Sequence, residues 1–387
     1  MTLCLTPLYA AADRGHFDVP KLLVDHGTDV NIGDKSGRTP LTTAAYNKHY
    51  EICRYLMIHA DVDYYKVGKF YGDILSLLSL HGDLVLCQKL VQNLPHANIN
   101  MKNRDRKTAL TLSLEHKHHQ ISNFLMDQGA KLEIDQDLAI LYNNCKDGHI
   151  DLTKLGVNFV DILCHCSLQG DLGLCQQLIQ SNPETDLNGK NRQKQTALNV
   201  AAVEEQYNVL DYLLSRGALW EDINEAIKDK LTPLYFLCKG GLFDWVRKFV
   251  EEYGAAIQAI DCLSVSAVEE HYDVLEYLLS QGATWEGEDI NKPIKGKLTP
   301  LYFVCRSGLL NLVTKFVGVY KADINGEGCL QASIEFYHTP IAKFLINSGC
   351  NVNQVKKPKI NLNSVILISF NFLVLSRNYI PDDGCKN

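Results

Sequence analysis

The sequence lacks the features of several large protein classes. No apolar segment reaches the roughly 20 residues of a transmembrane helix, and the longest one, Val365 to Leu375, is interrupted by Ser369 and Asn371. The apolar N-terminus, MTLCLTPLYAAA, has no basic region before it, so we expect no signal peptide. The GxxxxGK[ST] loop and the HExxH motif, typical of nucleotide hydrolysis and zinc proteolysis, are also absent. We therefore expect a protein without a membrane span and without these catalytic sites.

An excess of basic residues is missing too. There are 38 Lys and Arg residues against 45 Asp and Glu residues, which gives a net charge of −7. Nucleic-acid-binding domains are normally basic, so we expect no nucleic-acid partner. The 13 cysteines are odd in number and show no disulfide-like spacing. This usage is typical of a reducing compartment, which predicts a cytoplasmic protein.

The segment from Thr6 to Asn31 shows what the sequence does contain. Thr6 can cap a helix that begins at Pro7, where a missing N–H costs nothing. Gly15 predicts a tight turn before a second helix, whose apolar residues recur at helical spacing. Gly27 then stands where a left-handed helix end is expected. One such helix pair cannot bury its own apolar side, so the pattern predicts stacked copies.

This segment resembles an ankyrin repeat. The match comprises the Thr-Pro-Leu-Tyr start, the small Ala11-Ala12 pair, the Gly15-His16 turn and the Leu22-Leu23-Val24 run. The resemblance implies an all-α fold: an ankyrin-repeat solenoid of paired antiparallel helices with β-hairpin-like fingers.

The same pattern recurs along the chain about every 32 residues. Its core position, Leu23 in the first copy, stays apolar in nine later copies: Leu56, Leu90, Leu125, Leu178, Leu213, Phe249, Leu278, Phe316 and Leu345. Blocks longer than one repeat also recur, such as KNRDRKTAL from Lys102 and KNRQKQTAL from Lys190. We predict an array of about ten to eleven units over residues 1–353, with a degenerate unit near 139–160. Residues 354–387 form a tail outside the repeats.

The resemblance implies that partners bind the concave side, which is made of finger tips and of the residues before the turn between the two helices. The predicted turn residues are Asp13, Arg14, Tyr46, Asn47, His81, Glu115, His116, Lys146, Asp147, Glu204, Lys239, Glu269, Arg306 and Phe336. The predicted basic finger residues are Arg104, Arg106, Lys107, Arg192 and Lys194. The chemistry of this strip changes from unit to unit, which favours a binding surface for the strip as a whole, although for any single charge an ordinary solvated exterior is the favoured interpretation.

Three local features have competing interpretations. Cys164-His165-Cys166 with Cys175 could bind metal, but the spacing favours buried thiols, and we expect no metal. Trp220 and Trp285 could anchor a ligand or pack between repeats, and packing is favoured. Asn31, within the Asp-Val-Asn sequence, resembles an acceptor of asparaginyl hydroxylation, although such an asparagine can also serve only turn hydrogen bonds.

These observations predict a non-catalytic protein–protein interaction scaffold. We expect no enzyme activity, no cofactor and a monomeric array, with a protein partner of unknown identity. Two alternatives stay open: a client-selecting adaptor in a ubiquitin-ligase or signalling complex, or the ankyrin portion of a larger multidomain enzyme or channel.

Overall fold

A computed structural model describes residues 6–132, 135–258, 261–284, 289–296 and 298–352. The chain divides into two compact units, residues 1–220 and 221–387, and each is described by itself. Within the described residues there are helices and no named strand, so the predicted all-α fold is confirmed. The tail at 354–387 and Trp285 lie outside the described residues.

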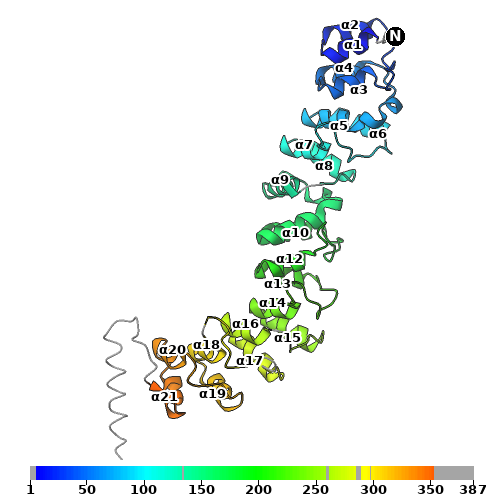
Figure 1. Cartoon of the computed structure of the whole chain (residues 1–387). Helices are drawn as coiled ribbons and strands as arrows, with labels where there is room; N and C mark the ends of the chain where they lie inside the picture. Colours follow the sequence, from blue (N-terminus) through cyan, green and yellow to red (C-terminus); the bar gives the residue numbers. More distant parts are fainter. Residues whose placement is uncertain (1–5, 133–134, 259–260, 285–288, 297, 353–387) are drawn as a thin grey trace, which may run out of the picture. The chain divides into compact units, whose positions relative to one another are not determined.

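The first unit is a stack of helix pairs (Figure 1). Its first-helix row consists of α1 (Pro7–Arg14), α3 (Pro40–Tyr46), α5 (Tyr71–Leu80), α7 (Ala109–Glu115), α9 (Asp135–Lys146), α10 (Phe159–Gln169) and α12 (Ala197–Val203). Its second-helix row consists of α2 (Asp18–Asp25), α4 (Tyr50–His59), α6 (Leu84–Asn93), α8 (His119–Asp127), α11 (Leu172–Ser181) and α13 (Tyr207–Ser215).

The second unit repeats the same plan. Its first helices are α14 (Pro233–Lys239), α16 (Cys262–Val268), α18 (Pro300–Ser307) and α20 (Cys329–Glu335). Its second helices are α15 (Phe243–Glu251), α17 (Tyr272–Ser280), α19 (Leu310–Gly318) and α21 (Thr339–Asn347).

Threonine caps explain where several first helices begin. The Thr6, Thr39, Thr108 and Thr196 hydroxyls each accept a hydrogen bond from the backbone N–H three residues later, at 3.1–3.3 Å. Such a cap satisfies one of the N–H groups that a helix leaves open at its start. Threonine therefore fixes these four helix starts locally, whereas Thr232 and Thr299, which precede proline, make no such side-chain bond.

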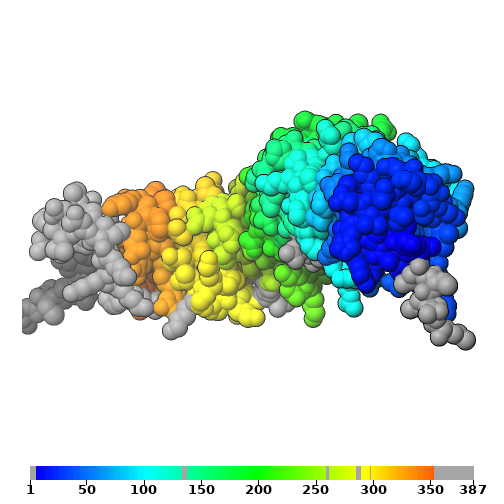
Figure 2. Space-filling model, turned by 90° about the horizontal axis from the view of Figure 1, so that it is seen from above, coloured from blue at the N-terminus to red at the C-terminus, as the bar shows by residue number. Residues whose placement is uncertain are grey.

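The second helices contribute one regular set of residues to the core. All nine later residues at the Leu23 position, from Leu56 to Leu345, are completely buried. Leu23 itself is only half-buried, and its neighbours Val19 and Leu22 are 43% and 59% exposed. The expectation that this whole apolar face is covered was therefore wrong for the first pair. The reason is position, since α2 packs mainly against α1 and α4, and the dark-blue surface of the first pair faces the viewer in Figure 2.

Neighbouring pairs are joined by a glycine and a histidine. Gly15 ends α1 in the left-handed conformation, with φ of 78°, and the His49 ring of the next pair lies against it. The His49 Nε2 is 3.2 Å from the carbonyl oxygen of Asp13. The same joint recurs as Gly82 with His118, Gly241 with His271, and Gly308 with His338.

The fingers are hydrogen-bonded turns. In the described residues their strand character is limited to two isolated bridges, Lys228 with Leu231 and Lys295 with Leu298. An asparagine in one finger accepts a hydrogen bond from a backbone N–H of the next; the pairs are Asn31 to Asp63, Asn100 to Lys131, Asn188 to Leu219, Asn224 to Ala256, Asn291 to Asp323 and Asn325 to Asn351. These side chains tie successive fingers together.

One position in the first unit departs from the plan. After α9 the chain forms two short 3₁₀ helices, η3 (Leu152–Lys154) and η4 (Gly156–Asn158), in place of a second α-helix. The same two-turn element, η1 (Tyr64–Lys66) and η2 (Gly68–Phe70), precedes α5. The two segments are 88 residues apart, which is the spacing of the duplicated KNR sequences.

Candidate functional site

Three hollows of similar size lie on the side formed by first helices and fingers. Their volumes are about 360, 370 and 350 Å³. Each is lined by residues of the following finger and by an aspartate near the start of a first helix: Asp73 and Asp161 lie in the first turn, and Asp261 is the cap. We call them the Asp73, Asp161 and Asp261 hollows. Small-molecule sites begin at about 300 Å³, so each has room for at least one large side chain.

The Asp73 hollow combines apolar walls with charged groups. Its residues are Ala45, Tyr46, Lys48, Asp73, Ser76, Leu77, Leu80, Asn103, Arg104, Asp105, Lys107, Leu112, Glu115 and His116. They come from the ends of α3 and α7, from α5 and from the finger between α6 and α7.

Most charges of this hollow are paired within the chain. Lys48 Nζ lies 2.6 Å from the Asp105 carboxylate, and Lys107 Nζ lies 2.6 Å from that of Glu115. The Arg104 guanidinium lies 4.8 Å from the centre of the Tyr46 ring, a cation–π contact. Asp73 is the remaining acid of the lining.

Asp73 and Ser76 lie three residues apart on α5, on the same helix face. One carboxylate oxygen of Asp73 accepts the Arg104 backbone N–H at 2.9 Å. Burial nevertheless raises the pKa of Asp73, and the hydrogen bond and the Arg104 charge only partly offset it. The Ser76 hydroxyl is buried, and among the described residues it has no hydrogen-bond partner. The second carboxylate oxygen of Asp73 and the Ser76 oxygen thus accept no hydrogen bond from a described residue.

The Asp161 hollow contains the copy of these residues 88 positions later. Here the Arg192 Nε donates to the Asp161 carboxylate at 3.1 Å. The Cys164 thiol donates to the Gln195 carbonyl at 3.7 Å. Asp161 and Cys164 therefore both have hydrogen-bond partners within the chain.

The Asp261 hollow, in the second unit, is lined by three carboxylates and two lysines. The carboxylates belong to Asp261, Glu269 and Asp289, and Tyr235 adds an aromatic wall. Asp261 has a left-handed backbone, with φ of 67°, at the start of α16.

The predicted binding residues fall into three groups. The first group lines the hollows: Tyr46, Arg104, Lys107, Glu115 and His116 at Asp73, Arg192 and Glu204 at Asp161, and Lys239 and Glu269 at Asp261. The structure thus brings together side chains from turns and fingers that are far apart in the sequence.

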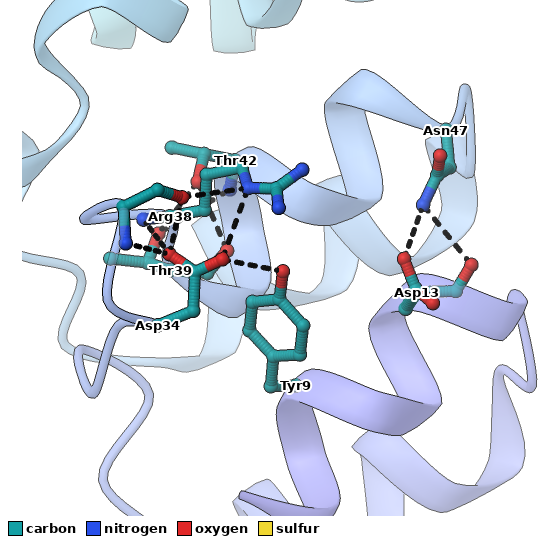
Figure 3. Close-up of polar contacts among 8 residues, drawn as sticks. Tyr9, Asp13, Asp34, Arg38, Thr39, Thr42 and Asn47 are labelled. Atoms are coloured by element: carbon teal, nitrogen blue, oxygen red, sulfur yellow. Dashed lines mark hydrogen bonds and ion pairs between the residues drawn. The ribbon is translucent and has the colours of Figure 1, made fainter. Parts of the chain in front are cut away.

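The second group is engaged between neighbouring repeats. The Asn47 amide donates to the Asp13 carboxylate at 2.9 Å (Figure 3), and His81 stacks on Tyr50 at 4.1 Å. Lys146 pairs with Asp171 at 3.4 Å. Arg306 pairs with Glu270 at 2.8 Å and lies over the Phe336 ring. These contacts hold repeats together.

The other predicted residues lie away from the hollows. Arg14 and Asp147 are exposed at or just after helix ends, and Arg106 and Lys194 occupy left-handed finger positions with φ of 62° and 63°. Asn31 donates to the Asp61 carbonyl at 2.7 Å and accepts the Asp63 N–H at 2.7 Å. Its amide therefore connects two fingers, and its hydroxylation stays a prediction.

Sequence reasoning missed Asp73 and Ser76 as candidate site residues. The signal that could have found them is the 88-residue duplication, which aligns Asp73 with Asp161 and Arg104 with Arg192. A carboxylate and an arginine conserved in both copies indicate a functional or structural pair.

The structure also describes the cysteines that the sequence offered as a possible metal site. Cys164, Cys166 and Cys175 are buried, and burial raises the pKa of Cys164 to about 12. No group of three metal-binding side chains occurs among the residues that the structure describes. Trp220 is only 9% exposed, which supports packing over ligand anchoring.

Among the described helices, none combines the length and the apolar character that crossing a membrane requires.

Parts of the chain are similar to a known family and to known proteins. A family model described as ankyrin repeats (3 copies) matches residues 2–66. The ankyrin repeat domain-containing protein oryK of Aspergillus oryzae is 30% identical over 149 residues, covering 36% of this chain and 21% of that protein. The NAD-dependent deacetylase sir2B of Dictyostelium discoideum is 23% identical over 291 residues, covering 75% of this chain and 34% of that protein.

A solved structure, the human ASB11 ankyrin repeat domain, matches with a TM-score of 0.35 at 20% identity, covering 53% of this chain and 96% of that one. The chain spans about a third of the length of the deacetylase and about a fifth of the length of oryK.

Proposed function

Because the chain is an ankyrin-repeat protein, we propose that it is a non-catalytic scaffold that binds partner proteins through the side formed by first helices and fingers. The observation that carries this proposal is the set of hollows, at Asp73 and Asp161 in the first unit and at Asp261 in the second, each with a different set of charges. A surface that varies on a regular frame is suited to recognition, since the frame need not change when the specificity does.

Rigid presentation supports the same function. The glycine–histidine joints and the asparagine contacts between fingers fix neighbouring repeats before a partner arrives. Side chains already held in place lose little conformational entropy on binding, so more of the contact energy appears as affinity.

We place this scaffold in the cytoplasm as a monomer. The cysteines support the assignment of a reducing compartment, because the eleven in the described residues are all free and buried. The acidic net charge of −7 favours protein partners over nucleic acid.

Affinity capture from cell extract tests the proposal. The bait is the full chain, compared with a variant in which Tyr46, His116, Lys239 and Arg306 are alanine. We expect the variant to lose the partners of the native chain, because truncating anchor side chains commonly costs more than about 1 kcal/mol each.

A matched control carries four alanines on exposed positions of the second helices, at Lys21, Gln92, Gln177 and Asn311. The control should keep the partners. Recovery of the same proteins by the first variant would show that partners do not use this side.

A further inference from the structure

We propose that the Asp73 hollow receives an arginine side chain of the protein partner, an inference that rests on the proposed scaffold function. Three observations carry it: the Asp73 carboxylate beside Ser76, whose hydroxyl has no partner among the described residues, the internal copy of the site at Asp161, and the position of Arg104.

The internal copy shows which chemical group this acid accepts. At Asp161 a guanidinium nitrogen, Arg192 Nε, donates to the carboxylate at 3.1 Å. Arg104 is the equivalent arginine 88 residues earlier, but only its backbone N–H donates to Asp73. The Asp161 carboxylate binds the guanidinium of Arg192. The equivalent Asp73 carboxylate does not bind the guanidinium of Arg104, so it can bind the guanidinium of a partner protein.

Tyr46 explains the difference between the two copies. It is the last residue of α3, and its ring holds the Arg104 guanidinium at 4.8 Å from the ring centre. The last residue of α9, the helix before the other copy, is Lys146, which pairs with Asp171 instead. Without an aromatic ring at that position, Arg192 lies on its aspartate.

The residue three positions after each aspartate, Ser76 or Cys164, also differs between the two copies. Cys164 donates to the Gln195 carbonyl in the closed copy. Ser76 is buried and makes no such bond to a described residue, although the finger it faces is folded alike: Asn103 N–H donates to Lys107 at 2.9 Å, and Asn191 N–H donates to Gln195 at 2.8 Å. The Ser76 oxygen is therefore available to accept a second guanidinium N–H.

The walls of the hollow fit the rest of an arginine side chain. Leu77, Leu80 and Leu112 supply apolar surface for its methylene groups, while Asp73 and Ser76 supply acceptors for its planar head. The rim lysines, Lys48 and Lys107, are neutralised by Asp105 and Glu115, so they oppose a cation less than their number suggests.

The probe for the test is Nα-acetyl-arginine methylamide, titrated into the full chain while backbone amide signals are followed by NMR. We expect saturable shifts at Asp73, Ser76 and Arg104. The isosteric citrulline compound should bind at least about tenfold more weakly, because it lacks the charge that strengthens a hydrogen bond to carboxylate. Equal binding of citrulline, or of the lysine compound, would overturn the assignment.

Four variants test the role of each residue. Asp73→Asn should weaken binding of the arginine probe by about tenfold or more, while Asp161→Asn should leave it unchanged because that acid is already paired. Tyr46→Ala should also weaken binding, since Arg104 is then free to close onto Asp73, and Tyr46→Phe should preserve it. Adding Arg104→Ala to Tyr46→Ala should restore binding.

The results separate this inference from the scaffold proposal. If Asp73→Asn or Tyr46→Ala binds the probe like the native chain, the arginine site is wrong, whatever the capture experiment gives. If the probe binds as expected but the four-alanine variant captures all partners, the scaffold proposal fails while the arginine site stands as a small-ligand site. The amide spectrum of each variant reports directly whether it is folded.

Discussion

At the scale of single residues, Asp34 shows how one carboxylate can organise a finger. It accepts hydrogen bonds from the Ser36 N–H and hydroxyl, from the Arg38 N–H and Nε, and from the Tyr9 hydroxyl at 3.0 Å (Figure 3). Tyr9 belongs to α1, so the network joins the first helix to the finger before α3. Burial acts to raise the pKa of Asp34, but the hydrogen bonds outweigh it and hold that pKa well below its usual range.

This shift predicts an acid-dependent contribution to stability. A carboxyl whose pKa is lower in the folded state stabilises the fold above its unfolded pKa, near 3.9 for aspartate, and this contribution is lost as the pH falls. The cost of Asp34→Asn in urea unfolding should therefore be about 1 kcal/mol smaller at pH 3 than at pH 5. An equal cost at both pH values would show that Asp34 is not held ionised by this network.

At the scale of elements, the joint between helix pairs can be tested with a matched pair of glycines. Gly15 and Gly27 have nearly the same backbone, with φ of 78° and 76°. A Cβ at Gly15 would lie 2.5 Å from a carbon of the His49 ring, whereas a Cβ at Gly27 would meet nothing within 4 Å. The two positions therefore share a left-handed φ and differ in what an added side chain would meet.

We expect Gly27→Ala to cost about 1 kcal/mol of unfolding free energy, from strain in the left-handed region alone. Gly15→Ala should cost at least about 2 kcal/mol, because it also displaces His49 from Asp13. Chemical denaturation measures both. In a His49→Ala background the Gly15 cost should fall to the Gly27 value, and persistence of the larger cost would exclude the ring as its cause.

The glycine–histidine joints show which contacts of a helix can be predicted from the sequence and which cannot. Gly15 and the helix start at Pro7 follow from local chemistry, because a left-handed turn favours glycine and the first helical turn tolerates proline. The sequence also points to a turn histidine, His16. The histidine that packs on Gly15 is instead His49, in the next pair, and local spacing alone cannot identify a partner that arrives through stacking.

The Asp73 hollow is a second feature that the sequence predicts only in part. Turn and finger positions predicted Tyr46, Arg104, Lys107, Glu115 and His116, all of which line it. Whether Asp73 is open depends on where the Arg104 side chain lies, and the same arginine in the copy at 192 takes the other position. Rotamer choice of this kind is set by a third residue, Tyr46, from another repeat.

At the scale of a whole unit, residues 1–220 contain one weak interface. Between α8 and α11 the described second-helix row has only η3 and η4; η3 contacts both helices, and η4 contacts α8 and α10. The links there include the exposed Lys154 with Asp127 at 2.9 Å, the part-buried Asn182 with the Leu152 carbonyl at 3.0 Å, and the buried Asn158 with the Ala130 carbonyl at 2.9 Å. Single contacts of this kind replace the continuous packing of a second α-helix, so we expect the coupling across this point to be weak.

Hydrogen exchange of paired core variants tests this weak coupling. Leu56→Ala and Leu213→Ala remove equivalent, completely buried side chains on opposite sides of the interface, each at a cost of about 2–5 kcal/mol. In an array whose stability is summed over neighbours, the effect of each should stop where coupling is weakest. Leu56→Ala should therefore accelerate amide exchange in α1 to α8 and leave α10 to α13 unchanged, and Leu213→Ala should do the reverse. Acceleration in all these helices by either variant would mean that residues 1–220 unfold as one cooperative body and that the 3₁₀ segment transmits stability as well as a full helix.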